Sequence, residues 1–218
     1  TKLGFLGGMA VPAVIRYGYG FVQGADAAAQ ELGTNIDINY FYGGQFYGDA
    51  NITSRMEGWY SNGTQVVFAC GGGIYTSAVD AAKKANAKVI GVDVDQAGVI
   101  AKYAGVDGMT VTSAMKGLYP ATYDTLTDVI VNGNWDKYVG KIATLGLVSG
   151  TDPEANYVQI PMGDGTQWSD SFTQDDYKAM VKDMFDGKIT VSNNTSSDVS
   201  AADFATVITV DDQGSIKG

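Results

Sequence analysis

The sequence predicts an α/β protein built on a Rossmann-like, doubly wound parallel sheet. Short runs of buried-type apolar residues alternate with longer stretches whose apolar residues recur every three or four positions. Several of the short runs end directly at glycine or aspartate. Strands that alternate with helices in this way form a parallel sheet covered on both faces and reached by right-handed crossovers. With 218 residues, of which 45% are hydrophobic, the chain can bury such a core.

The first half of the predicted sheet comes from residues 2–60. Residues 2–6 form a strand that ends at a pair of glycines, and the apolar residues from 14 to 32 share one face of a long helix. Pro12 stands where this helix begins and Gly33 where it ends. The elements expected next are a strand over 36–41, a glycine-rich loop over 46–49 and a helix over 51–60.

A strand, a helix and a second strand follow in residues 66–93. The apolar run 66–70 is closed by three glycines, a helical stretch occupies 78–85, and the run 89–92 ends at Asp93. In open α/β sheets, ligands bind beyond the carboxyl ends of the strands, so the glycines and Asp93 are expected on one rim. Glycine lets a ligand approach the backbone, and a carboxylate accepts hydrogen bonds from hydroxyl groups.

The pattern of the sequence changes after the last helix predicted within residues 1–132. Residues 109–112 form a short strand, and Ser113 caps a helix that ends near Gly133. Lys116 falls in the first turn of that helix, where a cation is slightly unfavourable, so a contact elsewhere explains it better. Loops rich in glycine and polar residues then connect strands over 142–148, 157–160 and 207–210 and a helix over 174–185. We therefore divide the chain into residues 1–132 and a C-terminal segment, 133–218.

Composition excludes several classes of function. The net charge is −10 and basic residues are not clustered, which argues against nucleic acid and anionic membrane surfaces as partners. The chain has no histidine and one cysteine, Cys70, so it has neither an internal disulfide nor serine-histidine or cysteine-histidine catalysis. No run of eighteen apolar residues occurs and no charged-then-apolar leader precedes Thr1, so we expect neither a membrane span nor an export signal in these residues.

Several short motifs occur in one order along most of the chain. They are Gly4–Met9, Gly20–Gly24, the loop Phe46–Asp49, Val66–Phe68 running into glycines, Val89–Gln96, Thr112–Lys116 and Asp186–Val191. Together they resemble the basic-membrane-protein (BMP) family of purine-nucleoside-binding lipoproteins, the substrate-binding proteins of ABC importers. The resemblance implies a fold like that of type I periplasmic binding proteins. Residues 1–132 would be the second lobe of a clamp, and residues 133–218 would return at least partly to a first lobe absent from this sequence.

The resemblance also implies the binding residues. Phe46 would stack on one face of the purine, Gly72 would bring its backbone close to the base, Asp93 would hold the ribose hydroxyls and Lys116 would reach the sugar. No catalytic residue, metal or cofactor is implied. The sequence departs from the family at residues 71–75, where Gly-Gly-Gly-Ile-Tyr replaces the common Ala-Gly-Gly-Thr-Gly.

Each of these residues also has an ordinary structural interpretation. Phe46 could cover the edge of the sheet, Asp93 could be a turn or helix-capping residue, and Lys116 could be solvated. Asp95 is the better candidate for the capping role. The glycines could form only a tight turn, because they lack the spacing of a dinucleotide or phosphate loop.

The leading hypothesis is an extracytoplasmic substrate-binding component, not an enzyme, that closes on a purine nucleoside and presents it to the permease and ATPase subunits of an ABC importer. It would meet the membrane only through a lipid anchor whose signal is outside these residues. One alternative is a nucleoside-processing enzyme with Asp93 or Asp95 as base and Lys116 as electrostatic stabiliser. The other is a ligand-sensing half-domain that acts through another protein.

Overall fold

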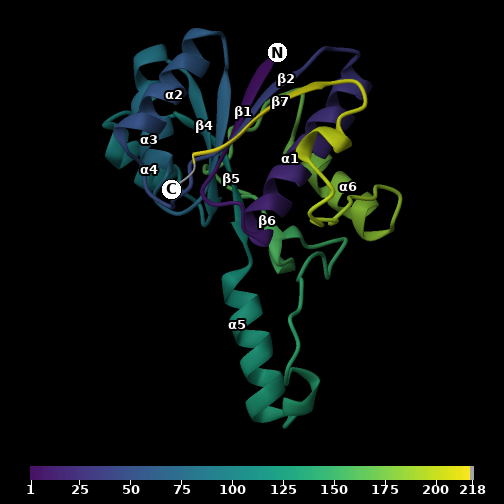
Figure 1. Ribbon diagram of the computed structural model, residues 1–218. Helices are drawn as coiled ribbons and strands as arrows, with labels where there is room; N and C mark the ends of the chain where they lie inside the picture. The colour runs from purple at the N-terminus through teal and green to yellow at the C-terminus, as the bar shows by residue number, and fades with distance from the viewer. Residues whose placement is uncertain (217–218) are drawn as a thin grey trace.

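One sheet organises residues 1–216, which the computed structural model describes (Figure 1). Its strand order is β6-β5-β4-β3-β1-β2-β7, and neighbours run parallel except for a short antiparallel pairing of β5 with β6. The predicted fold class is therefore confirmed. The strands are β1 (Lys2–Gly7), β2 (Asp37–Tyr42), β3 (Val66–Cys70), β4 (Lys88–Asp93), β5 (Thr110–Lys116), β6 (Val158–Gln159) and β7 (Thr209–Ser215).

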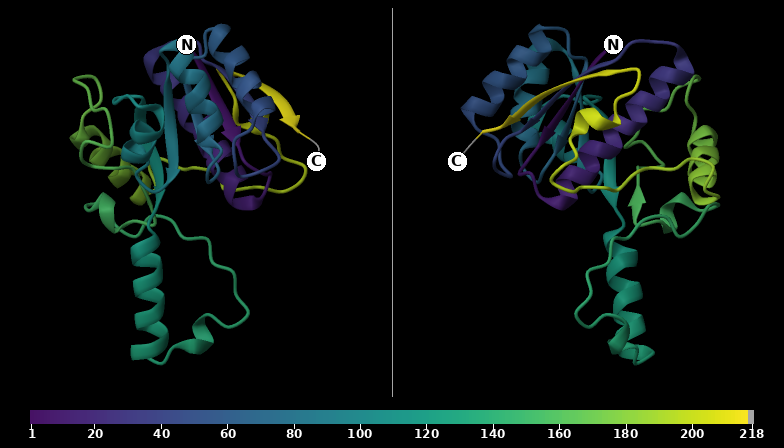
Figure 2. Two further views of the ribbon diagram at one scale, coloured as in Figure 1. Left: turned by 90° about the vertical axis from the view of Figure 1, so that its left-hand side faces the viewer. Right: turned by 45° about the vertical axis from the view of Figure 1, so that its right-hand side comes forward.

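Helices cover both faces of this sheet. The helices α2, α3 and α4 pack on one face and α1 runs along the other, as the two views of Figure 2 show. Their bounds are α1 (Pro12–Leu32), α2 (Ala50–Ser61), α3 (Tyr75–Ala85), α4 (Ala97–Ala104), α5 (Leu118–Leu126) and α6 (Gln174–Phe185). Within residues 1–216, no helix combines the length and the apolar character that a bilayer-spanning helix needs.

Two apolar layers hold the helices to the sheet. Adjacent strand residues point to opposite faces, so Phe5 lies in the layer under α1 while Leu6 lies in the layer under α2 and α3. Tyr40 and Phe41 divide in the same way. The rings of Phe5 and Tyr40 stack with their centroids 4.6 Å apart. Because both faces are buried, the strands read as continuous apolar runs, which is the pattern that predicts a parallel sheet.

The most consequential correction concerns the start of the helix after β5. That strand continues to Lys116, and α5 begins at Leu118, so Ser113 does not cap a helix and Lys116 is not in a first helical turn. The strand is longer because pairing with β4 extends through Met115 opposite Asp93. The Ser113 hydroxyl instead accepts a hydrogen bond from the Gln96 amide at 3.0 Å. The unfavourable helix position assigned to Lys116 therefore does not exist.

Other elements differ from the sequence prediction in informative ways. Helix α4 was not predicted, whereas α6 lies at the predicted residues. The strand predicted over 142–148 is wrong, because that segment is extended but pairs with no strand of the described chain. β-branched and leucine residues form a strand only where a neighbouring strand offers a ladder of backbone hydrogen bonds. This segment makes isolated contacts instead, such as the bond from the Tyr157 amide to the Gly146 carbonyl at 3.1 Å. The last strand begins at Thr209 and runs to Ser215, later than predicted.

An arm formed by residues 117–157 projects away from the rest of the described chain, which we call the body (Figures 1 and 2). It leaves and rejoins the body at one neck, where the Gly117 amide donates to the Tyr157 carbonyl at 2.9 Å. No residue of α5 is buried. The exposed large apolar residues of the arm are Leu118, Tyr119, Tyr123, Leu126, Ile130, Val131, Trp135, Val139, Ile142, Leu145 and Val148. The arm is thus an apolar surface without a covering layer in the described chain.

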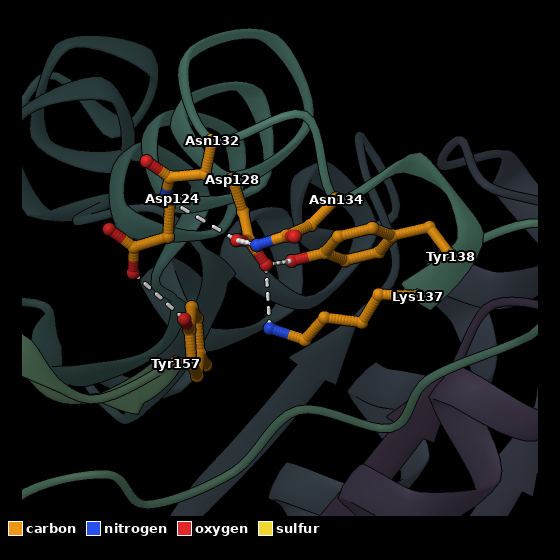
Figure 3. Close-up of polar contacts among 7 residues, drawn as sticks. All are labelled: Asp124, Asp128, Asn132, Asn134, Lys137, Tyr138 and Tyr157. Atoms are coloured by element: carbon orange, nitrogen blue, oxygen red, sulfur yellow. Dashed lines mark hydrogen bonds and ion pairs between the residues drawn. The ribbon is translucent and has the colours of Figure 1, made fainter.

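Polar contacts keep the arm folded (Figure 3). At its far end the Asp128 carboxylate accepts hydrogen bonds from Asn134 Nδ2, Lys137 Nζ and the Tyr138 hydroxyl at 2.7, 2.6 and 2.8 Å. The bond from Lys137 contributes most to holding the pKa of Asp128 well below its ordinary value. Nearer the neck, the Tyr157 hydroxyl donates to Asp124 at 2.8 Å. The arm therefore has a defined shape although little of it is buried.

The C-terminal segment is fastened to the body by Asp26 of α1. Its carboxylate accepts from the Thr206 and Val207 amides at 2.7 and 2.9 Å and also from the Thr206 hydroxyl and Gln30. Burial alone raises the pKa of Asp26, but these hydrogen bonds outweigh it and place the pKa well below its ordinary value. They bring the chain to β7, which pairs with β2 at the edge of the sheet. The division at residue 133 stays a prediction.

Candidate functional site

The candidate site lies along the carboxyl edge of the sheet. Four neighbouring strands, β1, β3, β4 and β5, end there, and the register places Gly7 beside Cys70 and Asp93 beside Met115. Strands β1 and β3 are neighbours although β2 lies between them in sequence, so the order reverses at this point. A crevice opens beyond the strand ends at such a reversal, and ligands of doubly wound sheets bind there.

Phe46 sits at this reversal, in the loop between β2 and α2. Its ring packs on the backbone of Gly8, after β1, and of Gly71, after β3; a Cβ at Gly71 would lie 3.0 Å from the ring carbon Cδ1. A Cβ at Gly8 would overlap the ring outright. The Gly73 amide donates to the Phe46 carbonyl at 2.8 Å, and the residue is 37% exposed. The glycines therefore seat one side of the aromatic ring while part of it stays open to solvent.

Gly72 lies beside Phe46 and is exposed. Its backbone has φ 51°, in the left-handed region that favours glycine, and an added Cβ would lie 3.2 Å from the Phe46 carbonyl oxygen. Substitution is therefore opposed by both conformation and space. The absence of a side chain leaves the peptide units around residue 72 accessible to a ligand.

Asp93 occupies a strained backbone position at the end of β4. Its φ is 69°, and the Val94 amide donates to the Val92 carbonyl across it at 2.8 Å, which makes Asp93 the centre of a γ-turn with positive φ. Such turns are rare, and backbone strain of this kind concentrates at functional sites. Asp95, in contrast, accepts from the Ala97 amide at 3.0 Å and so forms a local turn just before α4, whose N-cap is Gln96.

Lys116 pairs with Asp93 across the ends of β5 and β4. Its Nζ lies 2.8 Å from Asp93 Oδ1, and the two side chains are 40% and 37% exposed. Within residues 1–216, this ammonium is the one polar partner of the Asp93 carboxylate. Most of the acceptor capacity of the carboxylate is consequently free for other donors.

Cys70 ends β3, which lies between β1, on the Phe46 side of the edge, and β4, which carries Asp93. Its carbonyl accepts from the Gly8 amide at 2.9 Å, on the side where Phe46 lies. Burial raises the pKa of its thiol, and the Asp93 carboxylate raises it further. The thiol is thus a buried neutral group close to Asp93. The structure therefore brings together Phe46 with Gly72 and Asp93 with Lys116, on either side of Cys70.

The edge is an open shelf and not an enclosed cavity. Two surface hollows of about 490 and 470 Å³ lie elsewhere, and neither is lined by Phe46, Gly72, Asp93 or Lys116. The larger, between α2 and α3, is lined by Asp49, Glu57, Asp80, hydroxyl side chains and Tyr103. We favour the shelf as the site for three reasons. The strand order reverses there, Asp93 has a strained backbone, and the Phe46 ring packs on the backbone of Gly8 and Gly71.

Sequence reasoning missed two contributors to the shelf. Gly8 was part of a motif but not a site residue, and its role as a seat for Phe46 depends on a loop contact that spacing does not reveal. Tyr17 was assigned only to the apolar face of α1, yet Lys116 Nζ lies 5.7 Å from the centre of its ring. A tyrosine in an amphipathic helix carries no sequence signal that separates this position from the core.

Comparisons with known proteins place this chain in one family. The family model described as ABC transporter substrate-binding protein PnrA-like matches residues 1–159. The chain belongs to this BMP family of ABC transporter substrate-binding proteins. The family named from the sequence motifs is confirmed.

One curated protein and one solved structure are similar to this chain. The chain is 28% identical over 200 residues to the ABC transporter nucleoside-binding protein BmpA of Lactococcus lactis subsp. cremoris, covering 88% of this chain and 53% of that protein. A crystal structure of an ABC transporter solute-binding protein from Aeropyrum pernix K1 has a TM-score of 0.64 and 20% identity, covering 90% of this chain and 59% of that one. This second likeness shows the fold alone. The chain spans about half the length of the curated relative.

Proposed function

We propose that this chain supplies one lobe of an extracytoplasmic substrate-binding protein that captures a purine nucleoside for an ABC importer. The observation that carries the proposal is Asp93, a carboxylate held in a strained turn at the carboxyl edge of the sheet and paired with Lys116. Family membership and the name of the L. lactis relative support the choice of ligand. The permease and ATPase of the importer would be its protein partners, and a lipid anchor would hold it at the membrane.

The sugar would bind at Asp93 and Lys116. A carboxylate that accepts from two neighbouring hydroxyls forms charge-assisted hydrogen bonds, and the ammonium both donates to the ligand and offsets desolvation of the carboxylate. A site built this way rejects deoxy analogues, because closure of the two lobes would bury its polar groups and the missing hydroxyls would leave them unpaired.

The base would stack on Phe46. A flat purine gains roughly 1 to 3 kcal/mol from packing on an aromatic ring, and the gain tolerates different bases because each has a π face. The exposed backbone at Gly72 lies beside the ring, where the edge of a stacked base can reach peptide groups. The bulkier residues 74–75 of this chain do not obstruct the ring, since Ile74 is buried and Tyr75 packs edge-on to Tyr103.

The exposed apolar side chains of the arm support the proposal that two lobes close on the ligand. The shelf is open on one side, so a nucleoside bound there stays half solvated until another surface covers it. The arm leaves the body directly after Lys116 and carries uncovered apolar side chains, which suit packing against a second lobe. Closure of two lobes on a ligand is the usual motion of such binding proteins.

A titration followed by NMR would test the proposed site in the 218-residue chain itself. Inosine should shift the amide resonances of Phe46, Gly72, Asp93 and Lys116, even if binding to one lobe is weak. The analogue 2′,3′-dideoxyinosine should shift the first two and leave the last two unchanged. Shifts confined to the hollow between α2 and α3, or none at high ligand concentration, would count against the proposal.

The same samples separate binding from catalysis. Mass spectrometry of the nucleoside after prolonged incubation should recover it unchanged. Release of free base, or a phosphorylated product in the presence of phosphate, would favour the nucleoside-processing alternative with Asp93 as base.

A further inference from the structure

Lys116 has a long, flexible side chain, and a pair of solvent-exposed charges is a weak constraint on it. Exposed ion pairs contribute little free energy, because holding two mobile side chains together costs conformational entropy. Both side chains of the Asp93–Lys116 pair are more than a third exposed. A site that depends on the position of this ammonium therefore needs a further contact to fix it.

Tyr17 supplies an aromatic ring near the same ammonium. Lys116 Nζ lies 5.7 Å from the ring centroid of Tyr17 while also lying 2.8 Å from Asp93 Oδ1. A cation within about 6 Å of an aromatic face is attracted by the ring quadrupole. The ammonium is thus within reach of both a carboxylate from β4 and an aromatic ring from α1.

The ring of Tyr17 is itself held by the body. It packs edge-on against Phe68 of β3, with centroids 6.1 Å apart and planes at 80°. Its hydroxyl lies 3.4 Å from the Met115 carbonyl, to which it donates, and Met115 is the residue that pairs with Asp93 in the sheet. Tyr17 therefore contacts both the end of β5, the strand that carries Lys116, and the ring of Phe68 on β3.

The electrostatic surroundings keep Tyr17 in the role of a neutral donor. Burial raises the pKa of its phenol well above the ordinary value, and the nearby Cys70 and Asp93 groups raise it further. The hydroxyl therefore stays protonated at neutral pH and remains a donor to the Met115 carbonyl.

We propose that Tyr17 is a positioning residue of the sugar end of the shelf, which holds the Lys116 ammonium against Asp93 before any ligand arrives. Its importance to a ligand depends on the proposed nucleoside site, but its effect on Lys116 does not. Tyr17 acts through Lys116, so it fixes the direction of the ammonium donor and need not touch the sugar. A preformed donor spares the ligand part of the ordering cost on binding.

Competitive acetylation of lysines measures this directly in the intact chain. Trace acetic anhydride, with each site quantified by mass spectrometry, gives the reactivity of Lys116 relative to Lys178, an exposed lysine on α6. Tyr17→Leu, which removes ring and hydroxyl, should raise the relative reactivity of Lys116 about two- to fivefold, the change expected for loss of an exposed cation–π contact. Tyr17→Phe keeps the ring and should raise it less.

Two controls distinguish positioning from general loosening. Lys83 donates to the Ala104 carbonyl between α3 and α4, so its reactivity should stay constant in a correctly folded variant. Tyr103→Leu removes an exposed tyrosine of α4 and should leave Lys116 unchanged. A Tyr17→Leu variant in which Lys116 reacts as in the parent chain, or in which Lys83 rises equally, would overturn the proposal.

A double-mutant cycle gives the second test. Asp93→Asn should also raise the reactivity of Lys116. If the ring and the carboxylate hold the same ammonium, the effects of Tyr17→Leu and Asp93→Asn will not be additive, whereas independent effects add. Additivity would show that Tyr17 acts elsewhere. None of these measurements requires a bound nucleoside, so their failure is distinct from failure of the proposed function.

Discussion

The body and the arm each depend on an aspartate that accepts several hydrogen bonds, but the surroundings of the two carboxylates differ. Asp26 in the body is 5% exposed and joins α1 to the C-terminal segment, far away in sequence. Asp128 in the arm joins Asn134, Lys137 and Tyr138, which are six to ten residues away in sequence (Figure 3). Hydrogen bonds to a carboxylate thus join distant parts of the chain in the body, whereas in the arm they only hold a local segment in shape.

This difference bears on where function resides. In the body, buried layers on both faces fix the strand ends, and the candidate site inherits its geometry from them. In the arm, apolar side chains are exposed and polar contacts do the organising. The body therefore fixes the candidate site, whereas the arm presents an apolar surface, and the proposed two-lobed clamp needs both.

The largest expected effect comes from removing the Asp26 carboxylate. Asp26→Ala removes a buried carboxylate and the part-buried hydrogen bonds that it accepts from the Thr206 and Val207 amides, which should lower the free energy of unfolding by about 3 kcal/mol. Urea unfolding followed by circular dichroism measures this change. Asp128→Ala is the matched control, and it should leave the urea midpoint of the body unchanged. Equal losses in the two variants would mean that the arm folds cooperatively with the sheet.

Acid should act on the body through the same residue. The pKa of Asp26 in the folded chain lies below that of the unfolded chain, so its contribution is fully present above about pH 4 and is lost as the pH falls toward the folded-state pKa. Asp26→Asn keeps the shape without the charge. Its stability should therefore fall less steeply than that of the parent between pH 4 and pH 2 in parallel urea titrations. Identical slopes would assign the acid sensitivity to other carboxylates.

Changes at the shelf should alter binding more than stability. Phe46→Ala should weaken nucleoside binding by about 1 to 3 kcal/mol, with similar losses for adenosine and guanosine because stacking tolerates the base. Gly8→Ala should produce part of the same loss by displacing the ring without removing it. Tyr47→Ala, next to Phe46 and more exposed, serves as the control. A loss for one base but not the other would indicate that Phe46 reads the base edge and does not stack.

The sequence predicts the body far better than the arm for a physical reason. Buried strands and amphipathic helices carry periodic patterns, so β1 to β4, the bounds of α1 and the rim with Gly72 and Asp93 follow from the residues. Strand pairing is not encoded locally, which is why residues 142–148 look like a strand and are not one. The length of β5, and with it the position of Lys116, depends on its register against β4. The contacts of Phe46 with Gly8 and of Tyr17 with Lys116 join distant residues and leave no periodic trace.

The smallest expected effect separates the backbone role of Asp93 from its charge. Asp93→Asn and Asp93→Ala both remove the carboxylate, so both should lose the distinction between inosine and its 2′,3′-dideoxy analogue. Only alanine is penalised by φ 69°, because asparagine tolerates the left-handed region through local hydrogen bonds. The alanine variant should therefore be less stable than the asparagine variant by about 1 kcal/mol in urea unfolding. Equal stability would mean that the turn relaxes when the carboxylate is removed, and that the Asp93–Lys116 pair, not the backbone, maintains the strain.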